Sequence, residues 1–299
     1  MSAASTSSAD LYDQVAAAAA SVVIRRYSTS FGFAARLLRG PLRQHIENIY
    51  ALVRIADEVV DGAAAARVDA AGVFGQLERL ESECLHALEF GYSTNLVVHA
   101  FAQTARTAGF GPELSKPFFA SMRSDLAPGP LGQQGFEQYV YGSAEVVGLM
   151  CLRAFLIGQP NPDAQFEQLQ DGARRLGAAF QKINFLRDLA ADFHDLKRSY
   201  FPGISPEQLT DAQKNLLLDD IDADLAISRS AITQLPATSR SAVVLAHSLF
   251  AELSRRTRRT PAQELLHRRI RVPNPVKTRL AAAAVLGQNG LSYPERVRS

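Results

Sequence analysis

The sequence has few residues that could bind a metal ion through sulfur or nitrogen. Only two of its 299 residues are cysteines, Cys84 and Cys151, and its six histidines are scattered, without a C-x-x-C pair or a His/Cys cluster. This pattern gives no sign of a zinc site. A metal site in this protein must therefore use oxygen ligands, which favours Mg²⁺ or Mn²⁺.

Long apolar runs are also missing. No stretch of eighteen uncharged apolar residues occurs, so the sequence predicts no membrane span. The apolar stretch from Val15 to Ile24 is short, and the Ser/Ala-rich segment Met1–Ser8 before it lacks the positive charge of a secretory leader. We therefore expect a cytoplasmic protein.

The composition is that of a globular, helical chain. Hydrophobic residues make up 47% of it and charged residues 21%, and alternating β-branched runs are scarce. We predict one all-α domain, a single helical bundle over 11–290, between a disordered tail (1–10) and a C-terminal tail (291–299). Proline and glycine breaks divide it into helices at about 11–38, 42–61, 69–90, 94–108, 112–126, 134–158 and 164–194, with two or three more as far as Gly287.

Two of these predicted helices carry a stripe of side chains that can bind metal ions or phosphate. The stripes are Tyr50, Arg54, Asp57 and Asp61 on the first, and Gln181, Asn184, Asp188 and Asp192 on the second. At about 100° per residue, the first stripe stays within roughly 60° of arc and the second within roughly 80°. A lone D-x-x-x-D pair is usually a solvated surface, but here the other helix faces are apolar. If the two stripes meet across a cavity, four carboxylates converge, which requires cations between them and predicts a polynuclear Mg²⁺ site.

Two other segments allow more than one interpretation. Small residues at 142, 143, 144 and 148 leave room either for a close helix crossing or for a slender ligand, and Tyr141 could face a reacting centre or bond to the backbone. The segment Arg255–Arg279 holds nine Arg or Lys residues against one acidic residue, Glu264. It could face phosphate groups, an anionic membrane surface or only solvent, whereas nothing in it indicates nucleic-acid binding.

Four segments together resemble the signature motifs of the squalene and phytoene synthase family. They are Tyr27-Ser-Thr-Ser-Phe31, Tyr50-x-x-x-Arg54-x-x-Asp57-Glu-x-x-Asp61, Tyr139-x-Tyr-x-x-x-x-x-Val-Gly148 and Gln181-x-x-Asn184-x-x-Arg187-Asp188-x-x-x-Asp192. They occur in the family's order, and the resemblance extends from about Tyr27 to Lys277. Within the family, the segments 139–150 and 176–192 are most similar to phytoene synthases of carotenoid-making actinobacteria.

The resemblance implies an isoprenoid synthase fold, with a central cavity closed at one end by the two aspartate helices. It implies head-to-head condensation of two geranylgeranyl diphosphates to phytoene through a cyclopropyl diphosphate. The implied Mg²⁺ ligands, with Mn²⁺ as an alternative ion, are Asp57, Asp61, Asn184, Asp188 and Asp192. The implied diphosphate contacts are Tyr27, Ser28, Thr29, Ser30, Tyr50, Arg54, Gln181, Arg187 and Arg269, and Tyr141 is expected near the reacting carbons.

Some positions depart from the family pattern. Glu58 stands where many relatives have an aspartate, and Phe250 stands where several have a tyrosine, so a hydroxyl contact is lost there. Arg187 lies about 100° off the aspartate stripe. Arg269 aligns with a family arginine, but Arg268 and Arg271 compete for the same role.

Other functions stay open at this point. A squalene or dehydrosqualene synthase would use two farnesyl diphosphates, and only squalene formation would need NADPH; the phytoene interpretation needs none. A non-catalytic scaffold is the alternative from a different class, although its known examples have lost their aspartates. Hydrophobic substrates imply that the protein makes peripheral contact with the inner membrane surface. The sequence does not indicate an oligomeric state.

Overall fold

The structure is a computed structural model that describes residues 7–64, 66–126, 129, 131–194 and 200–287, without the side chains of 191–194. These residues are helical and contain no strand, which confirms the predicted all-α class. The helices are α1 Ser8–Tyr27, α2 Ser30–Ala35, α3 Pro41–Val60, α4 Ala70–Phe90, α5 Leu96–Ala108, α6 Pro112–Ser124, α7 Gln133–Val140, η1 Tyr141–Glu145, α8 Val146–Phe155, α9 Pro162–His194, η2 Pro206–Gln208, α10 Asp211–Gln234, α11 Ala237–Arg259, η3 Ala262–Leu266 and α12 Asn274–Val285.

The first predicted helix, 11–38, is wrong at its start and in its continuity. Helix α1 begins at Ser8, inside the predicted disordered tail, because Ser7 and Asp10 form a reciprocal capping box. It ends at Tyr27, and the residue that follows, Ser28, has an extended backbone and a hydroxyl that accepts the backbone N–H of Gly32 at 2.8 Å. The chain therefore restarts as the short helix α2. The predicted C-terminal tail 291–299 lies outside the described residues.

The helix predicted over 134–158 is helical without a break over 133–155, but it contains a π turn that the sequence did not predict. The π-helical turn η1 separates α7 from α8. Gly142 lies in this turn, pressed against α6 so closely that a Cβ would lie 2.2 Å from the Pro117 carbonyl oxygen. A π turn inserts one residue into the helix and re-aims the side chains that follow, and such turns are frequent at functional sites.

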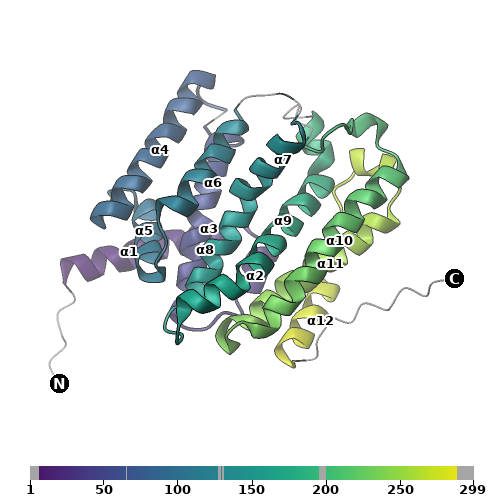
Figure 1. Cartoon of the computed structure of the whole chain (residues 1–299). Helices are drawn as coiled ribbons and strands as arrows, with labels where there is room; N and C mark the ends of the chain where they lie inside the picture. Colours follow the sequence, from purple (N-terminus) through teal and green to yellow (C-terminus); the bar gives the residue numbers. More distant parts are fainter. Residues whose placement is uncertain (1–6, 65, 127–128, 130, 195–199, 288–299) are drawn as a thin grey trace.

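The helices pack side by side, with α9 between the two halves of the molecule. In Figure 1, α1, α4 and α5 lie on one side of α9, and α10, α11 and α12 lie on the other. One buried core includes Phe101, Phe118 and Phe119 from α5 and α6, and another includes Ile183 and Leu186 of α9. None of the described helices is both long and apolar enough to span a bilayer.

Candidate active site

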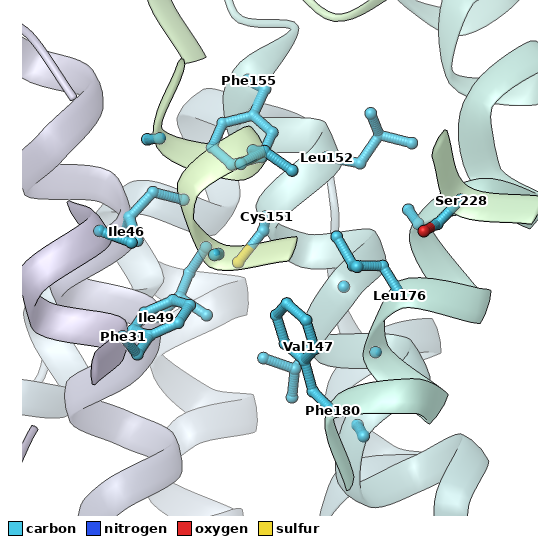
Figure 2. A pocket seen from close by; sticks show the side chains of 18 of the residues that line it. Phe31, Ile46, Ile49, Val147, Cys151, Leu152, Phe155, Leu176, Phe180 and Ser228 are labelled. Carbon is cyan, nitrogen blue, oxygen red and sulfur yellow. The ribbon is translucent and has the colours of Figure 1, made fainter. Parts of the chain in front are cut away.

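A cavity of about 300 Å³ lies between α2, α3, η1, α8, α9, α10 and α11. Its wall is almost entirely apolar, and Figure 2 shows Ile46 and Ile49 of α3 facing Leu176 and Phe180 of α9 across it. Pockets of this size and lining are typical sites for a small, mostly apolar ligand. The cavity is therefore suited to a hydrocarbon chain.

Apart from the serines Ser143 and Ser228, the polar side chains of the wall gather at one end of this cavity. In Figure 2, α3 and α9 run in the same sense along it, from Ile46 to Ile49 and from Leu176 to Phe180. The next lining residues in that direction are Tyr50 and Val53 on α3 and Gln181 and Asn184 on α9. Side chains four residues apart share a helix face. Asp57 and Asp188 therefore extend the two walls by one turn beyond this end.

The α3 side of the polar end is built around Arg54. Its guanidinium forms ion pairs with Asp57 and Glu58 and lies 4.6 Å from the centre of the Tyr27 ring. Burial lowers the pKa of Arg54, but the two neighbouring carboxylates outweigh it, so the pKa lies above its usual value. Asp61 ends the helix, and its backbone N–H donates to the carbonyl of Asp57 at 2.9 Å. Arg54 is thus a permanent cation between two carboxylates.

Tyr50 connects this cluster to the break between α1 and α2. Its ring stacks on Phe31, with centroids 5.6 Å apart, and its hydroxyl is hydrogen-bonded to Ser28. Burial raises the pKa of the Tyr50 hydroxyl, so it stays protonated. The predicted contacts Ser28, Thr29 and Ser30 therefore lie at a chain break that packs beside the polar end, with Thr29 and Ser30 beginning α2.

The α9 side is built around Asp188. The Nε of Arg269 lies 2.6 Å from its Oδ1 and the Nη2 lies 3.3 Å from its Oδ2, while Arg187 reaches around the helix to the same carboxylate. Arg268 instead pairs with Glu264 at 2.8 Å. Of the three competing arginines, Arg269 is thus the one that contacts Asp188.

Some of the side chains at the polar end are suited to bind a divalent cation. The Oδ1 of Asn184 is buried and has no hydrogen-bond partner among the described residues, which is what an amide oxygen awaiting a cation would show. The described side chains contain no cluster of three or more His, Cys, Asp or Glu residues that could hold a metal ion, and arginines pair with both Asp57 and Asp188. The side chain of Asp192 lies outside the described residues. The convergence of four carboxylates stays a prediction.

The small residues of η1 and α8 serve both of the uses that the sequence allowed. A Cβ at Gly148 would lie 2.5 Å from the carbonyl oxygen of Ala173, so α8 and α9 touch through backbone. Gly148, Ala144 and Ser143 also line the cavity. Tyr141 is not among its lining residues, and its ring lies 5.4 Å from the guanidinium carbon of Arg174. The expected position of Tyr141 near the reacting carbons stays a prediction.

Several site features escaped the sequence interpretation. Phe180 and Phe250 stack with centroids 3.8 Å apart and close the wall beside Gln181, so the position that lost a hydroxyl gained an apolar stack. Glu58, which departs from the family motif, forms an ion pair with Arg54, as Asp57 does. No short-range pattern could reveal the aromatic stack, because the two rings are far apart in sequence.

A bundle of helices around an apolar cavity with acidic and basic groups at one end defines a class of isoprenoid synthases. The sequence profile of the squalene/phytoene synthase family matches residues 24–275, and the chain belongs to this family. It is accordingly a prenyltransferase of the squalene/phytoene synthase type, which joins prenyl diphosphates head to head.

Individual relatives agree with the family. The chain is 27% identical over 248 residues to a phytoene synthase of Pseudescherichia vulneris, covering 76% of this chain and 77% of that protein. It is 26% identical over 253 residues to a 15-cis-phytoene synthase of a Paracoccus species, covering 79% and 80%.

Solved structures show the same fold. A dehydrosqualene synthase is similar with a TM-score of 0.75 and 20% identity, over 93% of this chain and 98% of that one. The squalene synthase of Alicyclobacillus acidocaldarius is similar with a TM-score of 0.70 and 18% identity, over 83% and 95%. The expected isoprenoid synthase fold is therefore confirmed.

Proposed function

We propose that this protein is a phytoene synthase, which condenses two geranylgeranyl diphosphates. The proposal is carried by the length of the apolar cavity below the acidic end. Its lining residues on α9 extend from Leu169 to Asn184, a helical rise of roughly 22 Å. An extended carbon chain advances about 1.3 Å per bond, so a geranylgeranyl chain spans about 19 Å and a farnesyl chain about 14 Å. A wall of this length supports the longer substrate, as do the phytoene synthases among the relatives.

The residues at the polar end have complementary tasks. Arg54, Arg187 and Arg269 supply guanidinium forks that match phosphate oxygens, and the hydroxyls of Tyr50 and Ser28 and the amide of Gln181 can add hydrogen bonds. Mg²⁺ held by Asp57, Asp61, Asn184, Asp188 and Asp192, or Mn²⁺ in its place, would neutralise the charge that develops on the leaving diphosphate.

The apolar wall protects the carbocations that ionisation of the diphosphates produces. The first allylic cation is attacked by a double bond of the second substrate, and loss of a proton from the resulting cation closes the ring to give a cyclopropyl diphosphate. A second ionisation and rearrangement follow, and loss of a proton ends the sequence without a reductant. Water would quench each cation. Side chains such as Phe31, Val147 and Phe180 exclude it below the polar end.

Product analysis tests this proposal. The purified protein is incubated with Mg²⁺ and either geranylgeranyl or farnesyl diphosphate, with and without NADPH, and the hydrocarbon is identified. We expect phytoene from the longer substrate, with no effect of NADPH. Efficient conversion of farnesyl diphosphate alone would instead identify a squalene or dehydrosqualene synthase, and the lack of any product would support a scaffold.

A variant at the far end of the cavity tests the length argument. Ala242 lines the cavity on α11 two turns before Phe250, and it is buried. The Ala242→Phe side chain would project into the space that the last isoprene unit needs. We expect its rate with geranylgeranyl diphosphate to fall at least tenfold relative to any residual rate with farnesyl diphosphate; an unchanged preference would refute the assignment of this end.

A further inference from the structure

A second pocket, of about 410 Å³, lies beside the active site and is lined mainly by arginine. We name it the arginine pocket; its lining residues are Arg255, Arg256, Arg259, Thr260, Arg268, Arg269, Ile270 and Arg271. They come from two segments, the last turns of α11 and the stretch that follows η3. Buried Thr260 and Ile270 form part of its wall. Six guanidinium groups are thus held around one concave surface.

The carboxylates that contact these arginines are too few to neutralise them. Glu252 is shared between Arg255 and Arg256. Glu264 pairs with Arg268, and Asp188 with Arg269. Arg259 and Arg271 have no acidic partner within the described part of the chain and are exposed. Among the residues that the structure describes, the pocket therefore keeps an excess of positive charge that an external anion would balance.

A purely structural role explains only part of this cluster. Arginines in the last turn of a helix favourably oppose its dipole, which accounts for the residues of α11. The same explanation does not cover Arg268, Arg269 and Arg271, which lie outside α11 yet line the same pocket. Like charges gathered from two segments repel one another, so their convergence points to a ligand.

We infer that the arginine pocket binds inorganic diphosphate. Guanidinium forks pair with phosphate oxygens in two-point contacts, and several forks around one pocket match an anion that carries several charges. Arg269 is common to this pocket and to the Asp188 ion pair, so it joins the pocket to the active site. If the protein has the proposed function, the bound diphosphate is the one released in the reaction. The binding of diphosphate to the pocket does not depend on that function.

An anionic membrane surface fits the pocket less well. Peripheral binding sites combine basic residues with apolar side chains that enter the lipid. The exposed large apolar residues of the described chain are all found elsewhere, the nearest in sequence being Ile227 and Val285. A concave pocket without an apolar rim is better suited to a small anion.

Isothermal titration of the full-length protein with inorganic diphosphate, without Mg²⁺ and at low salt, tests this inference. We expect saturable binding that weakens at least tenfold in the Arg259→Ala/Arg271→Ala double variant. The matched control is Arg258→Ala on the same helix, where Arg258 pairs with Asp219 at 3.0 Å and with Asp222 at 2.9 Å and does not line the pocket. It should bind diphosphate within twofold of the wild type. Circular dichroism verifies that each variant is folded, and Arg271→Glu, a single exposed change, should weaken binding further than Arg271→Ala.

Two further experiments distinguish a failure of the proposed enzymatic function from a failure of diphosphate binding. Asp188→Asn should abolish turnover but keep diphosphate binding, so a failure of the proposed enzymatic function is distinguishable from a failure of the pocket. Vesicles containing phosphatidylglycerol should bind no better than neutral vesicles. The inference is overturned if the wild type gives no saturable heat, if the double variant binds as the wild type does, or if anionic vesicles bind while diphosphate does not.

Discussion

The crossing of α9 with η1 and α8 forms one wall of the active-site cavity and depends on two glycines. A Cβ at Gly177 would lie 2.5 Å from the carbonyl oxygen of Ala144, and a Cβ at Gly148 would lie 2.5 Å from that of Ala173. Both obstacles are backbone atoms in helices, so no side chain can rotate away. A Gly177→Ala substitution must therefore move α9 away from η1 or bend one of these two elements.

The expected cost follows from these distances. A relaxed carbon–oxygen contact is about 3.3 Å, so the helices at Gly177 must move apart by roughly 0.8 Å. Overpacking of this kind costs about 1–3 kcal/mol, and the better helix propensity of alanine offsets about 0.5–1 kcal/mol. We expect Gly177→Ala to lower the free energy of unfolding by about 1–2 kcal/mol.

Urea denaturation followed by circular dichroism measures this change, with Gly75→Ala as the control. Gly75 lies within α4, and the nearest atom to a Cβ there is the end of the Arg79 side chain at 3.7 Å. The control should therefore gain about 0.5–1 kcal/mol from helix propensity alone. A Gly177→Ala protein as stable as the wild type would refute the close-crossing argument, as would shifts of the same sign in both variants.

Two further predictions concern titratable groups. Burial lowers the pKa of His45 and of His247, so their contribution to stability is complete above the unfolded pKa of about 6.5 and is lost as the pH falls through the folded pKa. Urea titrations should therefore show that the free energy of unfolding declines from pH 7 to pH 5, by up to about 1.4 kcal/mol per pH unit for each group. The decline should be less steep in His247→Gln, and a flat profile in the wild type would contradict the prediction. Burial also raises the pKa of the Cys84 and Cys151 thiols to about 12. Cys84 is fully buried, whereas Cys151 lines the cavity. A disulfide reagent at pH 8 should therefore modify Cys84 only after unfolding, and rapid labelling of Cys84 in the folded protein would count against its burial.

The sequence predicts best those features that depend on local patterns. The break at Gly40-Pro41 and the spacing of Asp57 and Asp61 place the first aspartate helix within a residue of α3, because capping and periodicity are local. The break at Ser28 and the π turn at Gly142 were missed. Both are decided by packing and by hydrogen bonds specific to the folded chain.

Side-chain choices at the site show the same limit. Sequence spacing could not decide which of Arg268, Arg269 and Arg271 approaches the second aspartate helix, because the choice depends on how the stretch after η3 packs against α9. Nor could it reveal that Phe250 closes the cavity by stacking on Phe180. Such contacts join segments many residues apart, and only the tertiary arrangement fixes them.

The central claim is that acidic groups on α3 and α9 act together on the departing diphosphate. The most direct test measures Mg²⁺-dependent release of diphosphate from geranylgeranyl diphosphate by Asp57→Asn and Asp188→Asn. Asp163→Asn is the matched control, since Asp163 lies at the opposite end of α9 with 85% of its side chain exposed. We predict that either site variant loses at least about a hundredfold in rate, or about 3 kcal/mol of barrier lowering, with an unchanged fold and a control at the wild-type rate. Near-normal release by either site variant would contradict the claim.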